Sequence, residues 1–319
     1  MHEFDIIKKY FSILSFKNKS SLNLNDDVFF DKHKKLVVSV DTYVEGVHFI
    51  DFKSPDLVIK KILRSSISDL ICKGVKPKYY FVSGSGNKNS FNKKNLELIS
   101  KSLNQEQKKY SIYLCGGDTT FSKKLSFTIM CIGFSNKIVF RNKAKFNDDI
   151  YVTGNLGDSF IGLRILQKKI HLNRALTKYF IEKYYHPNLY TNITKKLLSI
   201  ANTSIDISDG LVADLEKMIN NQKLSYKLYL KDIPISKNLN KLIDLKIIKK
   251  KTSVSCGDDY QILFTASPSK SRIISKIGKN LGIKISKIGK ICKSKDKSKI
   301  INEKNKKITL KNKGYFHKF

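Results

Sequence analysis

Leu36-Val37-Val38-Ser39-Val40 is a short apolar run that ends in Asp41 and predicts a buried β-strand. A helix follows, because Ser54-Pro55-Asp56 combines an N-cap, a proline in the first helical turn and an early acid. The apolar residues of this helix recur at helical spacing as far as Ile71, and Gly74 supplies the stop. The strand and the helix together indicate the start of a mixed α/β arrangement.

The same alternation continues through the first half of the chain. We expect strands at 79–83, 112–114 and 127–132 and a helix over 91–103. Together with the first strand, these elements form one mixed sheet with its helices.

A second strand–turn–helix unit opens after Asn147-Asp148, with its strand at 150–153 and its helix at 160–167. Further helices are expected at 176–184, at 190–200, directly after Asp209-Gly210 and from Pro268 to Gly282. The lysine-rich segment 293–313 predicts a solvated hairpin or tail. We therefore expect an α+β protein of two mixed α/β domains, residues 1–147 and 148–319, the second a two-layer α/β domain.

The composition is strongly basic: 61 Lys+Arg stand against 27 Asp+Glu in 319 residues, a formal charge of +34. With 41% apolar residues the chain can bury a large core, which excludes a mainly disordered protein. Only five of the basic residues are arginine. Nucleic-acid readers exploit the guanidinium fork, so an excess made almost wholly of lysine argues against a specific nucleic-acid partner.

The five cysteines are odd in number and widely spaced, which argues against a disulfide framework or a zinc knuckle. The first residues carry acids and lack a long apolar region, so no signal peptide is evident. The longest uncharged run, 125–136, is too short to cross a bilayer. These features predict a cytoplasmic protein with no membrane partner.

The acids are the informative minority, because several stand in uncharged surroundings at strand ends, helix ends and glycine turns. Clustered carboxylates repel one another unless cations lie between them, and Mg²⁺ meets that need. Taken singly, Asp209 could be a helix cap and Gly116-Gly117-Asp118 a turn. Asp69 is different, since it lies late in a helix and opposes the helix dipole. The turn Gly154-x-x-Gly157 could hold a phosphate, although alone it is a weak signal.

Seven ordered blocks carry a much more specific signal than any single acid. They are Asp26-Asp27, the stretch from Asp41 to Phe49, Ser68-Asp69-Leu70, Gly116-Gly117-Asp118-Thr119-Thr120, Gly154-x-x-Gly157-Asp158-Ser159, Asp206-x-Ser208-Asp209-Gly210-Leu211 and Gly257-Asp258-Asp259-Tyr260. In this order and spacing the chain resembles the thiamine-monophosphate kinase family, within the superfamily of aminoimidazole ribonucleotide synthetase-like enzymes that use ATP. The resemblance runs from Glu3 to Tyr315.

The resemblance implies ATP-dependent phosphorylation of thiamine monophosphate, several Mg²⁺ ions, and a homodimer in which the N-terminal sheets of two subunits pair. The implied Mg²⁺ ligands are Asp27, Ser39, Val40 (through its backbone), Asp41, Asp69, Asp118, Asp206 and Asp209. The implied ATP contacts are Gly117, Asp118, Arg141 and Ser208. The implied contacts to thiamine monophosphate are His48, Asp258 and Tyr315. Asn25, Val40, Phe121 and Asp258 depart from the residues that the family usually has.

The chemistry of such a reaction agrees with the residues present. The acceptor would be a phosphate oxygen, already ionised at neutral pH, so no general base and no nucleophilic side chain is required. Positioning and neutralisation of charge by metal ions then suffice for an in-line transfer. We therefore expect no catalytic residue in the narrow sense.

Two other readings stay open at this stage. Aminoimidazole ribonucleotide synthetase belongs to the same superfamily, and a basic nucleic-acid-binding protein is the alternative from a different class. Selenophosphate synthetase is disfavoured, because it needs a reactive cysteine near the N-terminus and none precedes Cys72. Binding of RNA that weakens steeply with salt would indicate non-specific adhesion.

Overall fold

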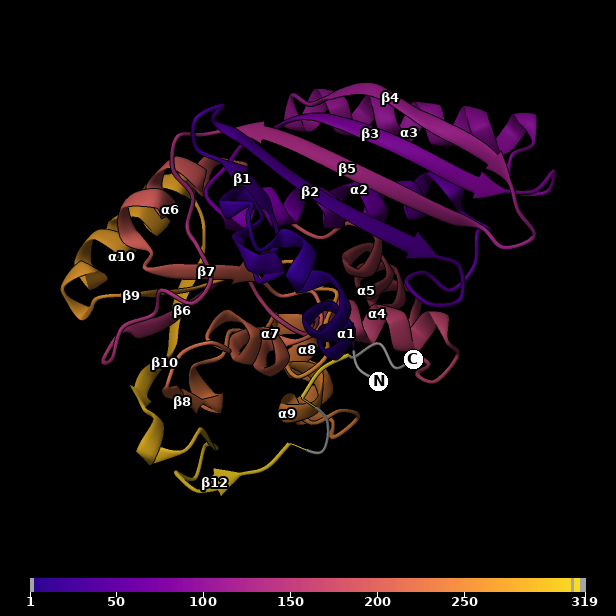
Figure 1. Ribbon diagram of the computed structural model, residues 1–319. Coiled ribbons are helices and arrows are strands. Elements are labelled where there is room, and N and C mark those ends of the chain that lie inside the picture. Colours follow the sequence, from indigo (N-terminus) through magenta and orange to yellow (C-terminus); the bar gives the residue numbers. More distant parts are fainter. Residues whose placement is uncertain (1–2, 311–312, 316–319) are drawn as a thin grey trace.

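The computed structural model describes residues 3–310 and 313–315, which build two β-sheets and the helices around them (Figure 1). The expected domains also include residues 1–2, 311–312 and 316–319, which lie outside the described residues. Both sheets mix parallel and antiparallel pairs, so the predicted mixed α/β architecture is confirmed. No helix in the described ranges is long and apolar enough to cross a membrane.

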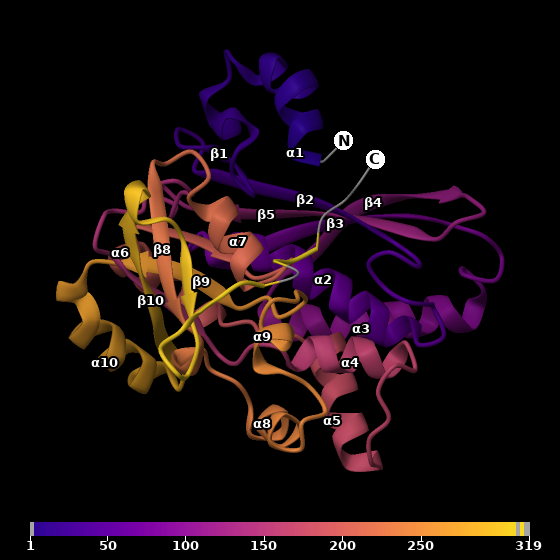
Figure 2. The same ribbon diagram turned by 90° about the horizontal axis from the view of Figure 1, so that it is seen from below.

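The first sheet has five strands in the order β1-β2-β5-β3-β4. Their bounds are β1 (Phe29–Asp31), β2 (Leu36–Val44), β3 (Pro77–Gly86), β4 (Tyr113–Phe121) and β5 (Ser126–Phe134). Two helices, α2 (Pro55–Cys72) and α3 (Lys93–Tyr110), cover one face. Figure 2 places a helical N-terminal segment on the opposite side of β2 from α3. That segment consists of α1 (Glu3–Ile6), η1 (Ile7–Phe11), η2 (Ser12–Ser15) and η3 (Lys19–Leu24).

The second sheet has seven strands in the order β12-β11-β8-β10-β6-β9-β7. Their bounds are β6 (Asp149–Thr153), β7 (Thr203–Asp206), β8 (Leu224–Tyr229), β9 (Ile262–Ala266), β10 (Ile285–Lys293), β11 (Lys299–Ile301) and β12 (Lys307–Ile308). The helices are α4 (Asp158–Leu166), α5 (Arg174–Tyr185), α6 (Thr194–Ile200), α7 (Leu211–Met218), α8 (Lys237–Asp244), α9 (Lys250–Ser253) and α10 (Ser271–Leu281). The connections between these strands and helices include four short 3₁₀ turns: η4 (Thr191–Ile193), η5 (Leu230–Asp232), η6 (Pro268–Lys270) and η7 (Ser294–Asp296).

Helix α2 lies between the two sheets, since it contacts β2 and β5 on one side and β7 on the other. Its apolar residues are buried almost throughout, as the helical spacing predicts. Side chains of α2 can therefore meet residues from the first sheet and residues at the end of β7 in the second sheet.

Strand β4 is longer than the predicted 112–114, because Gly116-Gly117-Asp118 continues the strand instead of turning. A Cβ added at Gly117 would lie 1.7 Å from the Val82 carbonyl oxygen, so only glycine allows β4 to approach β3 this closely. The basic segment after 293 adds the β11–β12 hairpin to the second sheet, in agreement with the hairpin interpretation.

Candidate active site

A cavity of about 800 Å³ opens between the first sheet, α2 and the loops of the C-terminal half. Its volume falls in the usual range for small-molecule sites. Eight of the fourteen predicted site residues line it: Asp41, His48, Asp69, Asp206, Ser208, Asp209, Asp258 and Tyr315. The structure thus brings together residues that are up to 274 positions apart in the chain.

Three carboxylates from three elements converge on this cavity. Asp41 comes from β2, Asp69 from the last turns of α2, and Asp206 from the final position of β7. The Asp41 and Asp69 side chains are hydrogen-bonded to each other, and the Tyr43 hydroxyl donates to Asp41 Oδ2 at 3.3 Å. We call these three acids, Asp41, Asp69 and Asp206, the carboxylate triad.

Burial and mutual repulsion disfavour the ionised forms of the three carboxyl groups in the triad. Burial raises the pKa of Asp41 to about 6 and the pKa of Asp206 to about 8, and the charge of Asp27 adds to both shifts. Burial and the neighbouring charge of Asp41 raise the pKa of Asp69 well above its ordinary value. Such a group gains most from a cation that neutralises it.

Oxygen ligands of this kind fit Mg²⁺, which takes one or two carboxylates and completes its octahedron with waters and phosphate oxygens. Within 3–310 and 313–315, no three His, Cys, Asp or Glu side chains form a complete metal-binding group. The triad therefore fits an ion shared with a bound phosphate better than one held by the protein alone.

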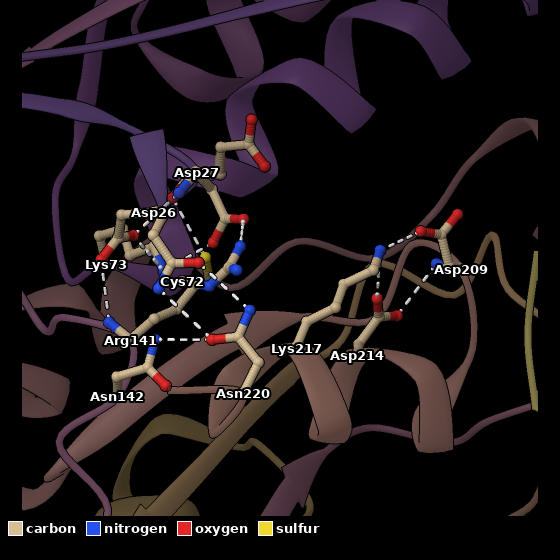
Figure 3. Close-up of polar contacts among 12 residues, drawn as sticks. Asp26, Asp27, Cys72, Lys73, Arg141, Asn142, Asp209, Asp214, Lys217 and Asn220 are labelled. Carbon is tan, nitrogen blue, oxygen red and sulfur yellow. Dashed lines mark hydrogen bonds and ion pairs between the residues drawn. The ribbon is translucent and has the colours of Figure 1, made fainter. Parts of the chain in front are cut away.

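Asp209 lies in the loop before α7 and is tied to two residues that sequence reasoning missed. Asp214 Oδ2 accepts hydrogen bonds from the backbone N–H groups of Asp209 and Gly210, at 3.0 and 2.9 Å. Lys217 forms ion pairs with both Asp209 and Asp214 (Figure 3). Asp214 stands in the first turn of α7, where acids are favoured by the helix dipole, so its role at the helix start could have been predicted from the sequence.

Asp258 also has a partner that the sequence did not reveal. Lys61, buried in α2, places its Nζ 2.5 Å from Asp258 Oδ1 and 4.0 Å from the centre of the Tyr184 ring. The Tyr260 hydroxyl donates to the same Oδ1 at 3.2 Å. One oxygen of Asp258 is thus fixed by two partners, which orients the carboxylate at the cavity wall.

His48 and Tyr315 are fixed through backbone contacts. The Val44 N–H donates to Nδ1 of His48 at 3.0 Å. The Tyr43 ring packs edge-on against the imidazole, with 5.7 Å between the two ring centres. The Tyr315 N–H donates to the carbonyl oxygen of Asp209 at 3.0 Å, so the backbone at residues 314–315 lies against the Asp209 loop.

Six predicted residues do not line the cavity: Asp27, Ser39, Val40, Gly117, Asp118 and Arg141. Ser39 is buried on the same face of β2 as Asp41, and its hydroxyl donates to the Ser66 carbonyl at 3.4 Å. Val40 points the other way and is 59% exposed. Gly117 and Asp118 belong to β4, which is exposed at every position. Asp27 is ion-paired with Arg141 outside the cavity lining.

The turn Gly154-x-x-Gly157 is occupied by the chain itself, so its interpretation as a phosphate cradle is wrong. Both carboxylate oxygens of Asp259 accept the Gly157 N–H, at 3.0 and 2.8 Å. Asp158 accepts hydroxyl hydrogen bonds from Ser236 and Tyr179, at 2.7 and 2.8 Å. These two acids hold the start of α4 in place.

Comparison with known proteins identifies the class of protein to which this chain belongs. Residues 25–135 match the family model AIRS, described as AIR synthase related protein, N-terminal domain. The thiamine-monophosphate kinase of Buchnera aphidicola subsp. Schizaphis graminum is 35% identical over 325 residues, 99% of this chain and 98% of that protein. The thiamine-monophosphate kinase of Haemophilus influenzae is 32% identical, over 91% of this chain and 89% of that protein. The chain belongs to the thiamine-monophosphate kinase family.

Solved structures agree on the fold. A structure described as AaThiL complexed with AMPPCP and TMP superposes with a TM-score of 0.84, at 23% identity, over 99% of this chain and 97% of that one. The thiamine monophosphate kinase of Aquifex aeolicus gives a TM-score of 0.79 at 25% identity, over 96% and 97%.

Proposed function

We propose that this chain transfers the terminal phosphoryl group of ATP to thiamine monophosphate and forms thiamine diphosphate and ADP. The observation that carries the proposal is the carboxylate triad facing an 800 Å³ cavity in a chain 35% identical to a named thiamine-monophosphate kinase. The complex of a structural neighbour with AMPPCP and TMP supports the same pair of substrates.

Asp41, Asp69, Asp206 and Asp209 would hold Mg²⁺ in this reaction. When bound, Mg²⁺ supplies positive charge that neutralises the triad and the phosphate oxygens during transfer. The chain's own task is to position the two phosphates for a direct in-line attack and to exclude water. No general base is required, because the acceptor oxygen is ionised before it attacks.

The substrate side of the cavity is formed by His48, Asp258 and Tyr315, which we propose contact thiamine monophosphate. The Asp258 oxygen that is not bound by Lys61 would accept a hydrogen bond from the aminopyrimidine or face the cationic thiazolium. Ser208, in the loop after β7, would contact ATP.

We further propose that the protein is a homodimer paired through the face of the first sheet that lies opposite α2 and α3. Large side chains are exposed on this face of the sheet, including Val40, Tyr113 and Phe134. A second copy would bury them and would also cover β4, an exposed edge that otherwise invites aggregation. Gly117 and Asp118 would then complete an ATP site in the dimer, with Arg141 as a further contact. The division into domains 1–147 and 148–319 belongs to the same proposal.

The experiment is an assay of the purified full chain with ATP, Mg²⁺ and thiamine monophosphate, in which thiamine diphosphate is separated by chromatography. Free thiamine serves as the control substrate, because it lacks the phosphate oxygen that the mechanism uses as acceptor. Failure to form thiamine diphosphate, or equal turnover of free thiamine, would contradict the proposal.

A further inference from the structure

Lys73, directly after α2, is a fully buried lysine in a ring of oxygen atoms (Figure 3). Its Nζ lies 2.8 Å from Asp26 Oδ1, 2.6 Å from Asp27 Oδ2 and 3.0 Å from the carbonyl oxygen of Ser204. Charged groups are rarely buried unless they are paired, and this one is paired twice.

Arg141 binds the other two carboxylate oxygens of the same pair. Its side-chain Nη1 lies 2.9 Å from Asp27 Oδ1, and its backbone N–H donates to Asp26 Oδ2 at 2.9 Å. Two acids therefore face two bases, and each of the four carboxylate oxygens has a partner. The charges of Lys73 and Arg141 outweigh the effect of burial and hold the pKa of Asp27 well below its ordinary value.

The nearby carboxylate triad is in the opposite situation. Among the described residues, Asp41, Asp69 and Asp206 form no ion pair with a lysine or arginine, and their pKa values are raised. Two groups of acids thus lie close enough to influence each other's titration, one neutralised by the chain and the other not.

We propose that Lys73 is a built-in cation that takes the place of a divalent ion at the Asp26–Asp27 pair, so that divalent ions bind only at the triad side. Mg²⁺ would have to approach an Asp27 oxygen to about 2.0–2.1 Å. Both oxygens already contact Lys73 or Arg141, so the incoming ion would meet two positive charges. Lys73 would also have to leave a site in which it is fully buried. Asp27 is then a partner of Lys73 and not a metal ligand, unlike the ligand set that the family resemblance implies.

The test is the number of Mn²⁺ ions bound per chain in the presence of AMPPCP, measured by the loss of the free-ion EPR signal during titration of the purified full chain with Mn²⁺. A titration of AMPPCP without protein is subtracted as the blank. The wild type and Asp27→Asn should bind the same number of ions. Asp69→Asn is the matched control from the triad and should bind fewer or bind more weakly. Lys73→Met should bind one ion more than the wild type, and the double variant Asp27→Asn/Lys73→Met should return to the wild-type number.

One ion fewer in Asp27→Asn than in the wild type would overturn the inference, and so would a wild type that binds no Mn²⁺. If Lys73→Met does not fold, the comparison of Asp27→Asn with the wild type still decides. The inference rests on the proposed function only for the expectation of ions at the triad. Because turnover is measured on the same preparations, missing kinase activity with unchanged ion counts would refute the function alone.

Discussion

Replacing Asp206 by asparagine should stabilise the metal-free protein at alkaline pH, although most substitutions of buried residues destabilise. Asp206 is 3% exposed at the end of β7, and burial raises the pKa of its carboxyl from 3.8 to about 8. The folded state therefore holds a proton that the unfolded chain releases above pH 3.8. Stability from this group is lost progressively as the pH rises from 4 to 8.

The size of the effect follows from the shift. Each pKa unit corresponds to about 1.4 kcal/mol, so a shift of about four units sets an upper bound near 6 kcal/mol. The charge is shared with neighbouring acids, and we take roughly half of the bound, about 3 kcal/mol at pH 8. Asparagine is nearly isosteric and stays neutral, so it removes this cost while its amide oxygen can still accept the hydrogen bond from Ser68.

Urea unfolding followed by far-UV circular dichroism, in EDTA at pH 5, 6.5 and 8, measures the difference. Asp206→Asn should exceed the wild type by about 3 kcal/mol at pH 8 and by about 1 kcal/mol or less at pH 5. Added Mg²⁺ should stabilise the wild type more than the variant. The exposed acid Asp232 provides the control, since Asp232→Asn should change little at any pH. A variant no more stable than the wild type at pH 8 in EDTA would refute the reasoning.

Three further predictions concern turnover and assembly. Asp69→Asn should lower kcat by about 10–100-fold or more, because it removes a metal ligand. Its unfolding midpoint in EDTA should be at or above that of the wild type. A wild-type kcat would contradict this prediction. Asp258→Ala should raise the KM for thiamine monophosphate about 10-fold or more and leave the KM for ATP unchanged, as steady-state kinetics can show; equal effects on both would withdraw the substrate contact. Light scattering at micromolar concentration should give the mass of a dimer, and a fully active monomer would count against the pairing of sheets.

The parts of the fold that the sequence predicts well are those in which burial dictates the pattern. Helix α2 is buried almost throughout, and strand β2 buries alternate residues, Val37, Ser39 and Tyr43, so the periodicity of both is strong. Strand β4 is the counter-example, because its residues are exposed and its glycines indicate a turn. The close approach of β4 to Val82 explains Gly117, and the Phe81 ring lies against Gly116; such approaches between distant segments leave no local signal.

The acids of the site were predictable because acids are scarce in this chain and several stand in uncharged surroundings, even where the structure places them inside a strand, as it does Asp41 and Asp118. Their basic partners were not predictable. Lys61 and Lys73 are two lysines among 61 basic residues, and nothing in their local sequence separates them from those on the surface. Both become distinctive only when folding buries them beside Asp258 and Asp27. The electrostatic balance of a site depends on such tertiary partners.

Transfer of the γ-phosphate label from [γ-³²P]ATP tests the central claim most directly. With thiamine monophosphate and Mg²⁺, the wild type should place the label in thiamine diphosphate, and Asp69→Asn should lose nearly all of that transfer. Free thiamine should receive no label. Label released only as inorganic phosphate, or equal labelling by the wild type and Asp69→Asn, would contradict a phosphoryl transfer that depends on the carboxylate triad.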